Sequence, residues 1–176
     1  MRASTLKGNV SDMSVAFTYA DRNQSHAETC TTIQQAMIEA GFQVISLGSC
    51  HLPPRLRQIH SDRAIRFIRH FPDYMMTDGK RGWLYDVKTR QNPSHVNHAV
   101  ELDSHETMVD LDRVGVPTFY VFDTLQAAWS IDVQFFRVFG RDEAADTKGS
   151  RTAFGLILPT ASFLTPLETF IERIQS

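Results

Sequence analysis

Apolar residues recur along this chain at two spacings, and each spacing predicts a different kind of element. Between residues 26 and 40 they recur every three or four positions, which predicts an amphipathic helix with Ser25 as its N-cap and Gly41 at its end. The short apolar run over residues 42–47 then predicts a strand. A helix followed by a strand therefore opens the predicted core.

Two further apolar runs, residues 71–77 and 83–89, flank a turn-rich segment that begins with an Asp-Gly pair. Runs separated in this way are typical of a β-hairpin. Side chains alternate between the two faces of a strand. In the second strand one face therefore carries Trp83, Tyr85 and Val87, and the other carries Leu84, Asp86 and Lys88.

Downstream, helical spacing returns and is followed by another apolar run. Residues 99–113 are predicted to form an amphipathic helix that Gly115 closes, and residues 117–122 a strongly apolar strand. Beyond Asp123 the predicted elements are a strand over 131–139, a polar loop over 140–151, a strand over 154–158 and a helix over 164–174. These later elements could extend the core sheet.

Length and composition favour a single domain over residues 1–176, with a core of about residues 25–123 and a C-terminal extension over 124–176. Hydrophobic residues make up 42% of the chain, and a formal charge of -2 argues against a protein that coats DNA without specificity. Cys30 and Cys50 form no CxxC pair, and the amino terminus lacks the apolar core of a signal peptide. No apolar stretch approaches the roughly eighteen residues that span a bilayer. We therefore expect a cytoplasmic protein with no membrane partner.

The polar residues at the ends of the predicted hairpin are of the kind that a metal-dependent phosphodiesterase uses. Asp73 follows Pro72 at the start of the first strand, and Asp86 and Lys88 stand at the end of the second. Mg²⁺ in proteins typically takes one or two carboxylates and keeps water or phosphate oxygens in its other positions. A nearby lysine can orient or help deprotonate the attacking water, and it offsets charge on the phosphoryl oxygens. The alternative interpretation is a solvated strand face without chemistry.

The order Pro72-Asp73, twelve further residues and Asp86-Val87-Lys88 resembles the motif of the PD-(D/E)XK nuclease superfamily. The resemblance implies a restriction-endonuclease-like α/β fold, a three-layer α/β/α domain with an αβββαβ core and a central mixed sheet. It also implies a nuclease that hydrolyses phosphodiester bonds of DNA with Mg²⁺ or Mn²⁺. Asp73, Asp86 and Lys88 would be catalytic. The metal would be held by Asp73, by Asp86 and Val87 of the triplet, and by a glutamate of the first helix.

Two glutamates of the first predicted helix could fill that role, Glu28 and Glu39. The resemblance favours Glu28 as a catalytic and metal-binding residue, because the residues around it, with Gly41-Phe42 and Gly48-Ser49, are similar to the opening segment of archaeal Holliday-junction resolvases. The spacing departs from the resolvase pattern, and a shift of two residues turns a helix by about 200°. Both glutamates could instead be ordinary surface residues.

A basic segment lies between the first strand and the hairpin, within residues 55–70. The candidates for contact with the nucleic-acid backbone are Arg55, Arg66 and Arg69 of this segment, together with Arg90 after the second hairpin strand. The alternative is a solvated helix whose apolar face packs on the domain.

Three residues near the second predicted helix, His98, Glu101 and His105, are three and four positions apart. On a helix this spacing would let their side chains share a ligand. No cysteine pair and no His-Glu-X-X-His signature accompanies them, so a zinc site has little support.

The functions that follow from these residues fall into two classes. In the enzyme class, the first choice is a metal-dependent deoxyribonuclease, and the alternative is a Holliday-junction resolvase-type structure-specific endonuclease that works as a homodimer. In the other class, a nuclease-like fold binds nucleic acid or protein without cleaving, although the intact Asp73, Asp86 and Lys88 argue against it. The aromatic and basic content does not separate DNA from RNA. Without an appended recognition module, target choice would rest on the loops of the domain or on a targeting partner protein.

Overall fold

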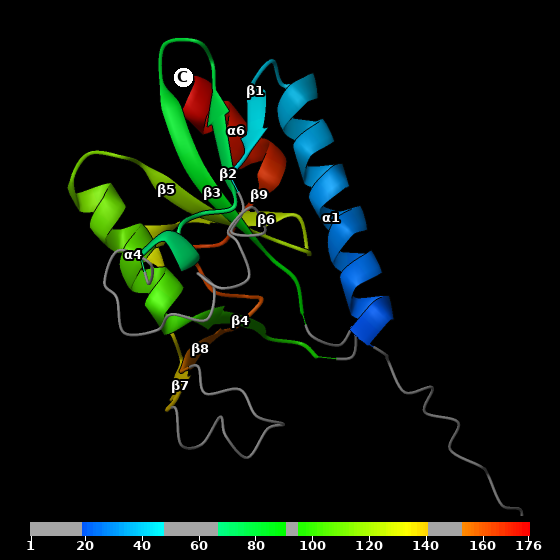
Figure 1. The fold of residues 1–176 in the computed structure, drawn as a ribbon, viewed down its shortest axis with the longest axis vertical. Helices are drawn as coiled ribbons and strands as arrows, with labels where there is room; N and C mark the ends of the chain where they lie inside the picture. Colours follow the sequence, from blue (N-terminus) through cyan, green and yellow to red (C-terminus); the bar gives the residue numbers. More distant parts are fainter. Residues whose placement is uncertain (1–18, 48–66, 91–94, 141–152) are drawn as a thin grey trace, which may run out of the picture.

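The computed structural model describes residues 19–47, 67–90, 95–140 and 153–176 (Figure 1). Arg55 and Arg66, with most of the predicted basic segment, lie outside the described residues. The same is true of Cys50 and of most of the loop predicted over 140–151.

The elements follow one another along the chain in a helix, strand, hairpin, helix and strand order, with additional strands interspersed and a final helix. They are α1 (Tyr19–Glu39), β1 (Gln43–Ser46), β2 (Tyr74–Thr77), β3 (Gly82–Lys88), β4 (His98–Glu101), α4 (Leu102–Arg113), β5 (Thr118–Phe122), β6 (Gln126–Trp129), the short 3-10 helix η2 (Ser130–Asp132), β7 (Arg137–Phe139), β8 (Phe154–Ile157), β9 (Thr165–Pro166) and α6 (Leu167–Gln175).

A six-stranded mixed sheet of order β1-β2-β3-β5-β6-β9 forms the centre of the fold. Within it β3 and β5 run parallel, and the other neighbouring strands run antiparallel. A second sheet, of order β4-β8-β7, lies at the lower end of the molecule in Figure 1. All the pairs in this smaller sheet are antiparallel.

Helices cover both faces of the central sheet. On one face, Ile33 of α1 and Phe170 of α6 belong to the same buried cluster as Tyr85 of β3. On the other face, Met108 of α4 packs in a cluster with Tyr120 of β5. This three-layer arrangement confirms the predicted α/β class with a mixed central sheet. Among the described helices, none combines the length and the apolar character that a bilayer crossing requires.

The predicted hairpin is confirmed by the pairing of β2 with β3. Tyr74 lies opposite Tyr85, and Thr77 lies opposite Gly82 at the other end of the ladder. Gly79 in the turn has a φ of 85°, a conformation that glycine adopts without a steric penalty. The predicted alternation also holds for the apolar face of β3, since Trp83, Tyr85 and Val87 all belong to the cluster with α1 and α6.

The first helix begins earlier than its sequence pattern predicts. It starts at Tyr19, so Ser25 lies inside α1 and is not its N-cap. The Ser25 carbonyl instead accepts a hydrogen bond of 2.9 Å from the Thr29 hydroxyl, one turn further along. Residues 19–25 contain neither proline nor glycine, so the local sequence does not oblige the helix to stop at the serine.

The helix predicted from residue 99 is wrong in its first turn, because residues 98–101 form β4. This strand pairs antiparallel with β8, which lies more than fifty residues away and places Val100 opposite Gly155. The pairing is a tertiary contact, and it overrides the helical spacing of the local sequence. The helix therefore begins only at Leu102.

The C-terminal extension differs in detail from its prediction. β6 and β9 extend the central sheet, whereas β7 and β8 join β4 in the second one. The strand predicted over 131–139 is wrong over its first part, where η2 occupies Ser130–Asp132 and only residues 137–139 are extended in a sheet. α6 begins at Leu167 and not at residue 164, because Pro166 disfavours a helical conformation in Thr165 before it, and Pro166 itself has an extended backbone.

Candidate active site

The register of the hairpin brings the two predicted carboxylates together. Tyr74 is the first residue of β2 and lies opposite Tyr85, so Asp73 before it comes beside Asp86. The two side chains are within hydrogen-bonding reach of each other. The carbonyl of Asp73 also accepts a hydrogen bond of 2.7 Å from the amide of Leu47, which holds it to the end of β1. Asp73 is therefore positioned by both neighbouring strands.

One carboxylate is buried and the other half-buried: Asp86 is shielded from water, whereas Asp73 is partly exposed. Asp86 is only 6% exposed and sits on the face of β3 where Tyr120 of β5 is its cross-strand neighbour. Burial raises the pKa of the Asp73 carboxyl well above its ordinary value, and the negative charge of Asp86 raises it further. Lys88 opposes this shift without cancelling it. Two acids held this close favour a shared proton or an added cation.

Lys88 forms an ion pair with one of these acids. Its Nζ atom lies 2.6 Å from Oδ2 of Asp86, and the two side chains are 19% and 8% exposed. Burial disfavours the ammonium, but Asp86 outweighs that effect and raises the pKa of Lys88, with smaller contributions from Glu101 and Asp73. The group is therefore an ammonium at neutral pH. It can donate hydrogen bonds to a water or a phosphoryl oxygen.

The arrangement fits a divalent cation with hard oxygen ligands. A cation would relieve the repulsion between the adjoining carboxylates of Asp73 and Asp86, which are the ligand type and number that Mg²⁺ usually takes. Val87 could contribute only its main-chain carbonyl, since its side chain is buried in the core. In the part of the chain that the structure describes, no three His, Cys, Asp or Glu side chains form a ready cage. A cation here would retain several waters.

Residues 86–88 extend past the end of the neighbouring strand. β2 begins at Tyr74 opposite Tyr85, whereas β3 continues for three residues to Lys88. On its other edge β3 remains paired with β5 as far as Phe122. Asp86 and Lys88 thus lie in the part of β3 that projects beyond the end of β2.

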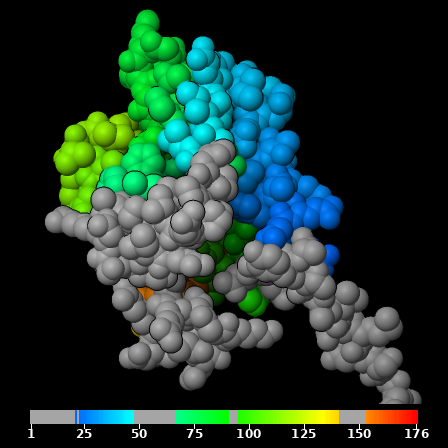
Figure 2. Space-filling model, in the orientation of Figure 1, coloured from blue at the N-terminus to red at the C-terminus, as the bar shows by residue number. Residues whose placement is uncertain are grey.

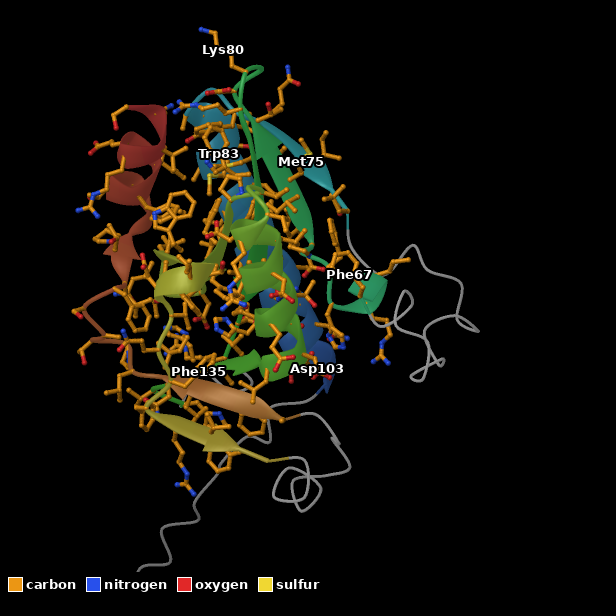
Figure 3. The ribbon with its side chains drawn as sticks, turned by 90° about the vertical axis from the view of Figure 1, so that its left-hand side faces the viewer. Phe67, Met75, Lys80, Trp83, Asp103 and Phe135 are labelled. Carbon is orange, nitrogen blue, oxygen red and sulfur yellow. The ribbon has the colours of Figure 1, made fainter. Side chains whose placement is uncertain are left out.

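Two groups of contacts hold the segments on either side of these acids. Before Pro72, the His70 ring lies 3.1 Å from the Ser104 hydroxyl and 3.8 Å from the carboxylate of Asp103, which projects from α4 (Figure 3). After Lys88, the carboxylate of Asp123, which directly follows β5, binds the chain at Arg90. The site residues are therefore anchored to both α4 and β5.

Asp123 is the centre of the second group. Its amide donates a 3.1 Å hydrogen bond to the Lys88 carbonyl, and its Oδ2 atom accepts bonds from the amide (3.1 Å) and the Nε atom (3.0 Å) of Arg90. The His98 ring, 1% exposed, lies 3.5 Å from its Oδ1 atom. Arg90 also donates to the carbonyl of His95. The guanidinium of Arg90, a predicted nucleic-acid contact, is thus engaged within the domain.

The structure does not bring Glu28 to the carboxylates. Glu28 lies on the exposed side of α1, where its Oε1 atom accepts a 2.9 Å hydrogen bond from Gln24. Glu39 is likewise exposed and accepts a 2.9 Å bond from Gln35. The side of α1 turned toward the sheet carries Cys30, whose pKa is raised by burial and further by the charges of Asp73 and Asp86. Glu28 lies two positions before Cys30, a rotation of about 200° about the helix axis, so the packing that buries Cys30 leaves the glutamate exposed.

The remaining predicted residues are dispersed. Arg69 is half-buried at the end of a helical segment over residues 67–69, while Arg55 and Arg66 lie outside the described residues. His98 is in β4, and His105 is on α4, where its ring packs against Phe135 at a centroid distance of 4.9 Å. The zinc site considered from the spacing requires His98, Glu101 and His105 to lie on one helix. His98 and Glu101 instead lie in β4, so the helical spacing does not apply to them.

No family model matches the chain, and no curated protein matches it in sequence. Its fold is similar to that of Hjc, a Holliday junction resolvase from the archaeal hyperthermophile Archaeoglobus fulgidus. The TM-score is 0.50 at 11% sequence identity, and the similarity covers 84% of this chain and 95% of the resolvase. The α/β domain with its mixed central sheet is therefore of the restriction-endonuclease-like type.

Proposed function

We propose that the protein is a metal-dependent nuclease that hydrolyses phosphodiester bonds of DNA. The observation that carries the proposal is the group formed by Asp73, Asp86 and Lys88, in which the buried carboxylate of Asp86 adjoins the half-buried carboxylate of Asp73 and the ammonium lies 2.6 Å from Asp86. The similarity in fold to a Holliday junction resolvase supports it. Because one fold can serve many functions, the proposal rests on the residues of the site.

In this proposal Asp73 and Asp86, with the carbonyl of Val87, hold Mg²⁺ or Mn²⁺. The bound ion would supply Lewis-acid stabilisation of the phosphoryl group and a water of lowered pKa. The Lys88 ammonium donates a hydrogen bond to a phosphoryl oxygen and orients the attacking water, whose oxygen bonds to phosphorus as the bond to the leaving oxygen breaks. One proton leaves the water for solvent, and the leaving oxygen takes up a proton.

A second candidate is cleavage of a branched DNA structure, the Holliday-junction resolvase-type activity. Similarity to Hjc along 95% of that chain favours it. Two copies of the chain would then act on one junction, with an active site in each. A targeting partner protein is the other way in which such a domain could select its substrate.

The test is cleavage of labelled linear duplex, single-stranded, nicked and four-way-junction DNA and of RNA, each with Mg²⁺, Mn²⁺ or EDTA. We expect metal-dependent cutting of DNA that Asp86→Ala and Lys88→Ala both lose. Matched controls are Asp110→Ala on α4 and Lys80→Ala, which change the same residue types at exposed positions. Lys80 lies at the tip of the hairpin (Figure 3). The preferred substrate separates the two candidates.

Three results would contradict the proposal. Cleavage that survives in EDTA, or in both site variants, would remove the metal-dependent mechanism. Cleavage of RNA alone would correct the substrate class. Binding of nucleic acid without any cutting by the wild type would favour a nonenzymatic binding module on this fold.

A further inference from the structure

A pocket of about 430 Å³ lies at the end of β3 opposite to the proposed active site. The start of β3, the connection from α4 to β5, the end of β6 and the end of α6 meet there. The side chains used below are Arg81, Trp83, Pro117, Trp129 and Arg173. A pocket of this size can take a small organic ligand.

The pocket is separate from the acids. Trp83 precedes Lys88 by five positions in β3, a distance of roughly 17 Å along an extended strand. The turn of the hairpin projects from the upper end of the molecule (Figure 2, green). Trp83 lies toward that turn, whereas Asp103 of α4 lies toward the other end (Figure 3). None of the proposed catalytic residues lines the pocket.

Two guanidinium groups make the pocket positively charged. The Nε atom of Arg81 lies 3.2 Å from Oδ2 of Asp78, and within the described ranges this is its one carboxylate partner. Arg173 on α6 donates a long hydrogen bond, 3.5 Å, to the Thr165 hydroxyl, and it forms no ion pair with any residue that the structure describes. The two arginines thus share one acid. The remaining charge favours an anionic ligand, and guanidinium groups suit phosphate oxygens in particular.

Aromatic surface adjoins these charges. The chain has two tryptophans, and both line this pocket. Trp83 is 5% exposed, and the guanidinium carbon of Arg81 lies 5.1 Å from its ring centroid, so Trp83 forms an inner wall beneath that arginine. Trp129 is half-buried and held by Phe170 at a centroid distance of 4.9 Å. Its accessible part can contact a flat ligand.

Main-chain groups beside the pocket are engaged at the connection from α4 to β5. The Gly115 amide donates a 3.0 Å hydrogen bond to the Asp112 carbonyl. Pro117 has no amide hydrogen, and its carbonyl accepts a 3.0 Å bond from the Leu84 amide. A peptide recognised through its backbone would therefore find few partners here. Guanidinium groups beside aromatic rings are instead the combination that binds the phosphate and the base of a nucleotide.

We propose that this pocket binds a nucleotide, with its phosphate held by Arg81 and Arg173 and its base against Trp129. A phosphate joined to an aromatic base occurs both in a free nucleotide and in one unit of a single strand, and the experiment separates these two sources. The site goes beyond the proposed nuclease function and does not depend on it. Binding is reversible and involves no covalent step.

Fluorescence measures occupation directly, because both tryptophans of the chain line the pocket. The full chain is titrated in EDTA with thymidine monophosphate, thymidine, inorganic phosphate, a short single-stranded oligothymidylate and a peptide with a free terminal carboxylate. Calorimetric titration gives the affinities independently. The variants are Arg81→Ala, Arg173→Ala and Trp129→Phe. Arg113→Ala is the matched control, since Arg113 is exposed and paired at 3.2 Å with an acid three positions before it, as Arg81 is.

We expect thymidine monophosphate to quench the fluorescence saturably, and thymidine or phosphate alone to bind at least about tenfold more weakly, because each keeps one of the two contacts. Arg81→Ala and Arg173→Ala should each lose about tenfold in affinity, as is typical for a hydrogen bond to a charged group. Arg113→Ala should stay within about twofold of the wild type. Trp129→Phe should lose most of the quenching and keep most of the calorimetric affinity, because a phenyl ring still stacks on the base.

The source of the nucleotide follows from the first titrations. Oligothymidylate that binds more than about tenfold tighter than the mononucleotide, and loses affinity in the same arginine variants, identifies a single strand. Equal affinities identify a free nucleotide. Both results support the site.

Four results would overturn the proposal: no binding of either nucleotide form by the wild type, phosphate bound as tightly as thymidine monophosphate, tighter binding of the peptide, or an equal loss in Arg113→Ala. Asp86→Ala should bind as the wild type does, and a loss there would place the nucleotide at the acids instead. Because binding is measured in EDTA and without cleavage, its failure leaves the nuclease proposal untouched. Melting curves identify any variant whose loss comes from unfolding.

Discussion

The two ends of the β2–β3 hairpin place the same kind of residue in opposite surroundings. At the turn, the exposed carboxylate of Asp78 accepts hydrogen bonds from the amides of Lys80 (2.8 Å) and Arg81 (2.7 Å) and from the Arg81 guanidinium (3.2 Å). These bonds lower the pKa of Asp78, the Arg81 amide most. At the other end, burial and the charge of Asp86 raise the pKa of Asp73.

The difference separates an end of the hairpin that is stabilised locally from the end that we propose to be catalytic. The turn satisfies its carboxylate with local amides, which stabilise the ionised acid and the turn together. The projecting end holds two adjoining acids, the buried Asp86 and the half-buried Asp73, with a single ammonium paired to Asp86, an arrangement that costs stability unless another cation is present. Such a local conflict is characteristic of functional sites.

The largest expected effect comes from removing one charge at the projecting end. Asp73→Asn should reduce metal-dependent DNA cleavage on the order of 10³-fold, because the amide is a poor ligand and its electrostatic contribution to the transition state is lost. Rates measured at saturating Mn²⁺ test this. Asp110→Asn on α4 is the control, and an equal loss there would show that the effect is not specific to the site.

A divalent cation should stabilise the wild type by binding between the carboxylates of Asp73 and Asp86. At one hundred times its dissociation constant, a ligand of the folded state adds about 2.7 kcal/mol to the free energy of unfolding. Thermal unfolding with Mn²⁺ and with EDTA measures the difference. If Asp86→Asn retains the full stabilisation, the cation binds elsewhere.

Without a cation, Asp73→Asn should be more stable than the wild type at neutral pH by about 1–2 kcal/mol, since the aspartate must take up a proton or hold its charge beside Asp86 on folding, whereas asparagine is neutral in both states. The sign follows from the raised pKa of Asp73. The folded state holds a proton that the unfolded state has released, so this acid lowers wild-type stability as the pH rises from about 4 toward neutrality. Urea unfolding in EDTA at several pH values should therefore show an advantage of Asp73→Asn that grows with pH.

The smallest effect is expected at the turn, where Asp78→Ala should destabilise slightly and leave cleavage unchanged. Because the pKa of Asp78 is lowered, its contribution is present at neutral pH and is lost as the pH falls below the ordinary range of an aspartate. The sign is thus opposite to that at Asp73. Urea midpoints at neutral and acidic pH measure both, and a cleavage defect in Asp78→Ala would contradict the division between the two ends.

The hairpin was predictable because its signals are local. Alternation between residues 83 and 88, the Asp-Gly turn and the pairing of two apolar runs depend on neighbours along the chain. They correctly placed Asp86 and Lys88 on the same face and brought Asp73 beside them. The strand β4 was not predictable in this way, since its partner β8 is distant in sequence. The residues around Val100 have helical spacing, and that local pattern gives no sign of the pairing with β8.

The contribution of α1 shows the same limit at the scale of a single residue. The sequence indicated a helix and a candidate, Glu28, but the rotation of that helix about its axis depends on which side packs against β3. In the structure that side carries Cys30 and Ile33, so His26 faces Thr89 and the glutamate is exposed. Likewise nothing in the sequence connects Asp123 with Arg90, which meet because β5 ends beside β3.

The sequence by itself determined the fold class, the hairpin and the acid–base triplet, because periodicity and turn chemistry act between residues a few positions apart. Only the tertiary structure decided that Asp86 is buried, that Arg90 is engaged within the domain and which side of α1 packs on the sheet. These properties arise from packing between segments distant in the chain, and a rotation of about 100° per residue is enough to exchange one helix side chain for another.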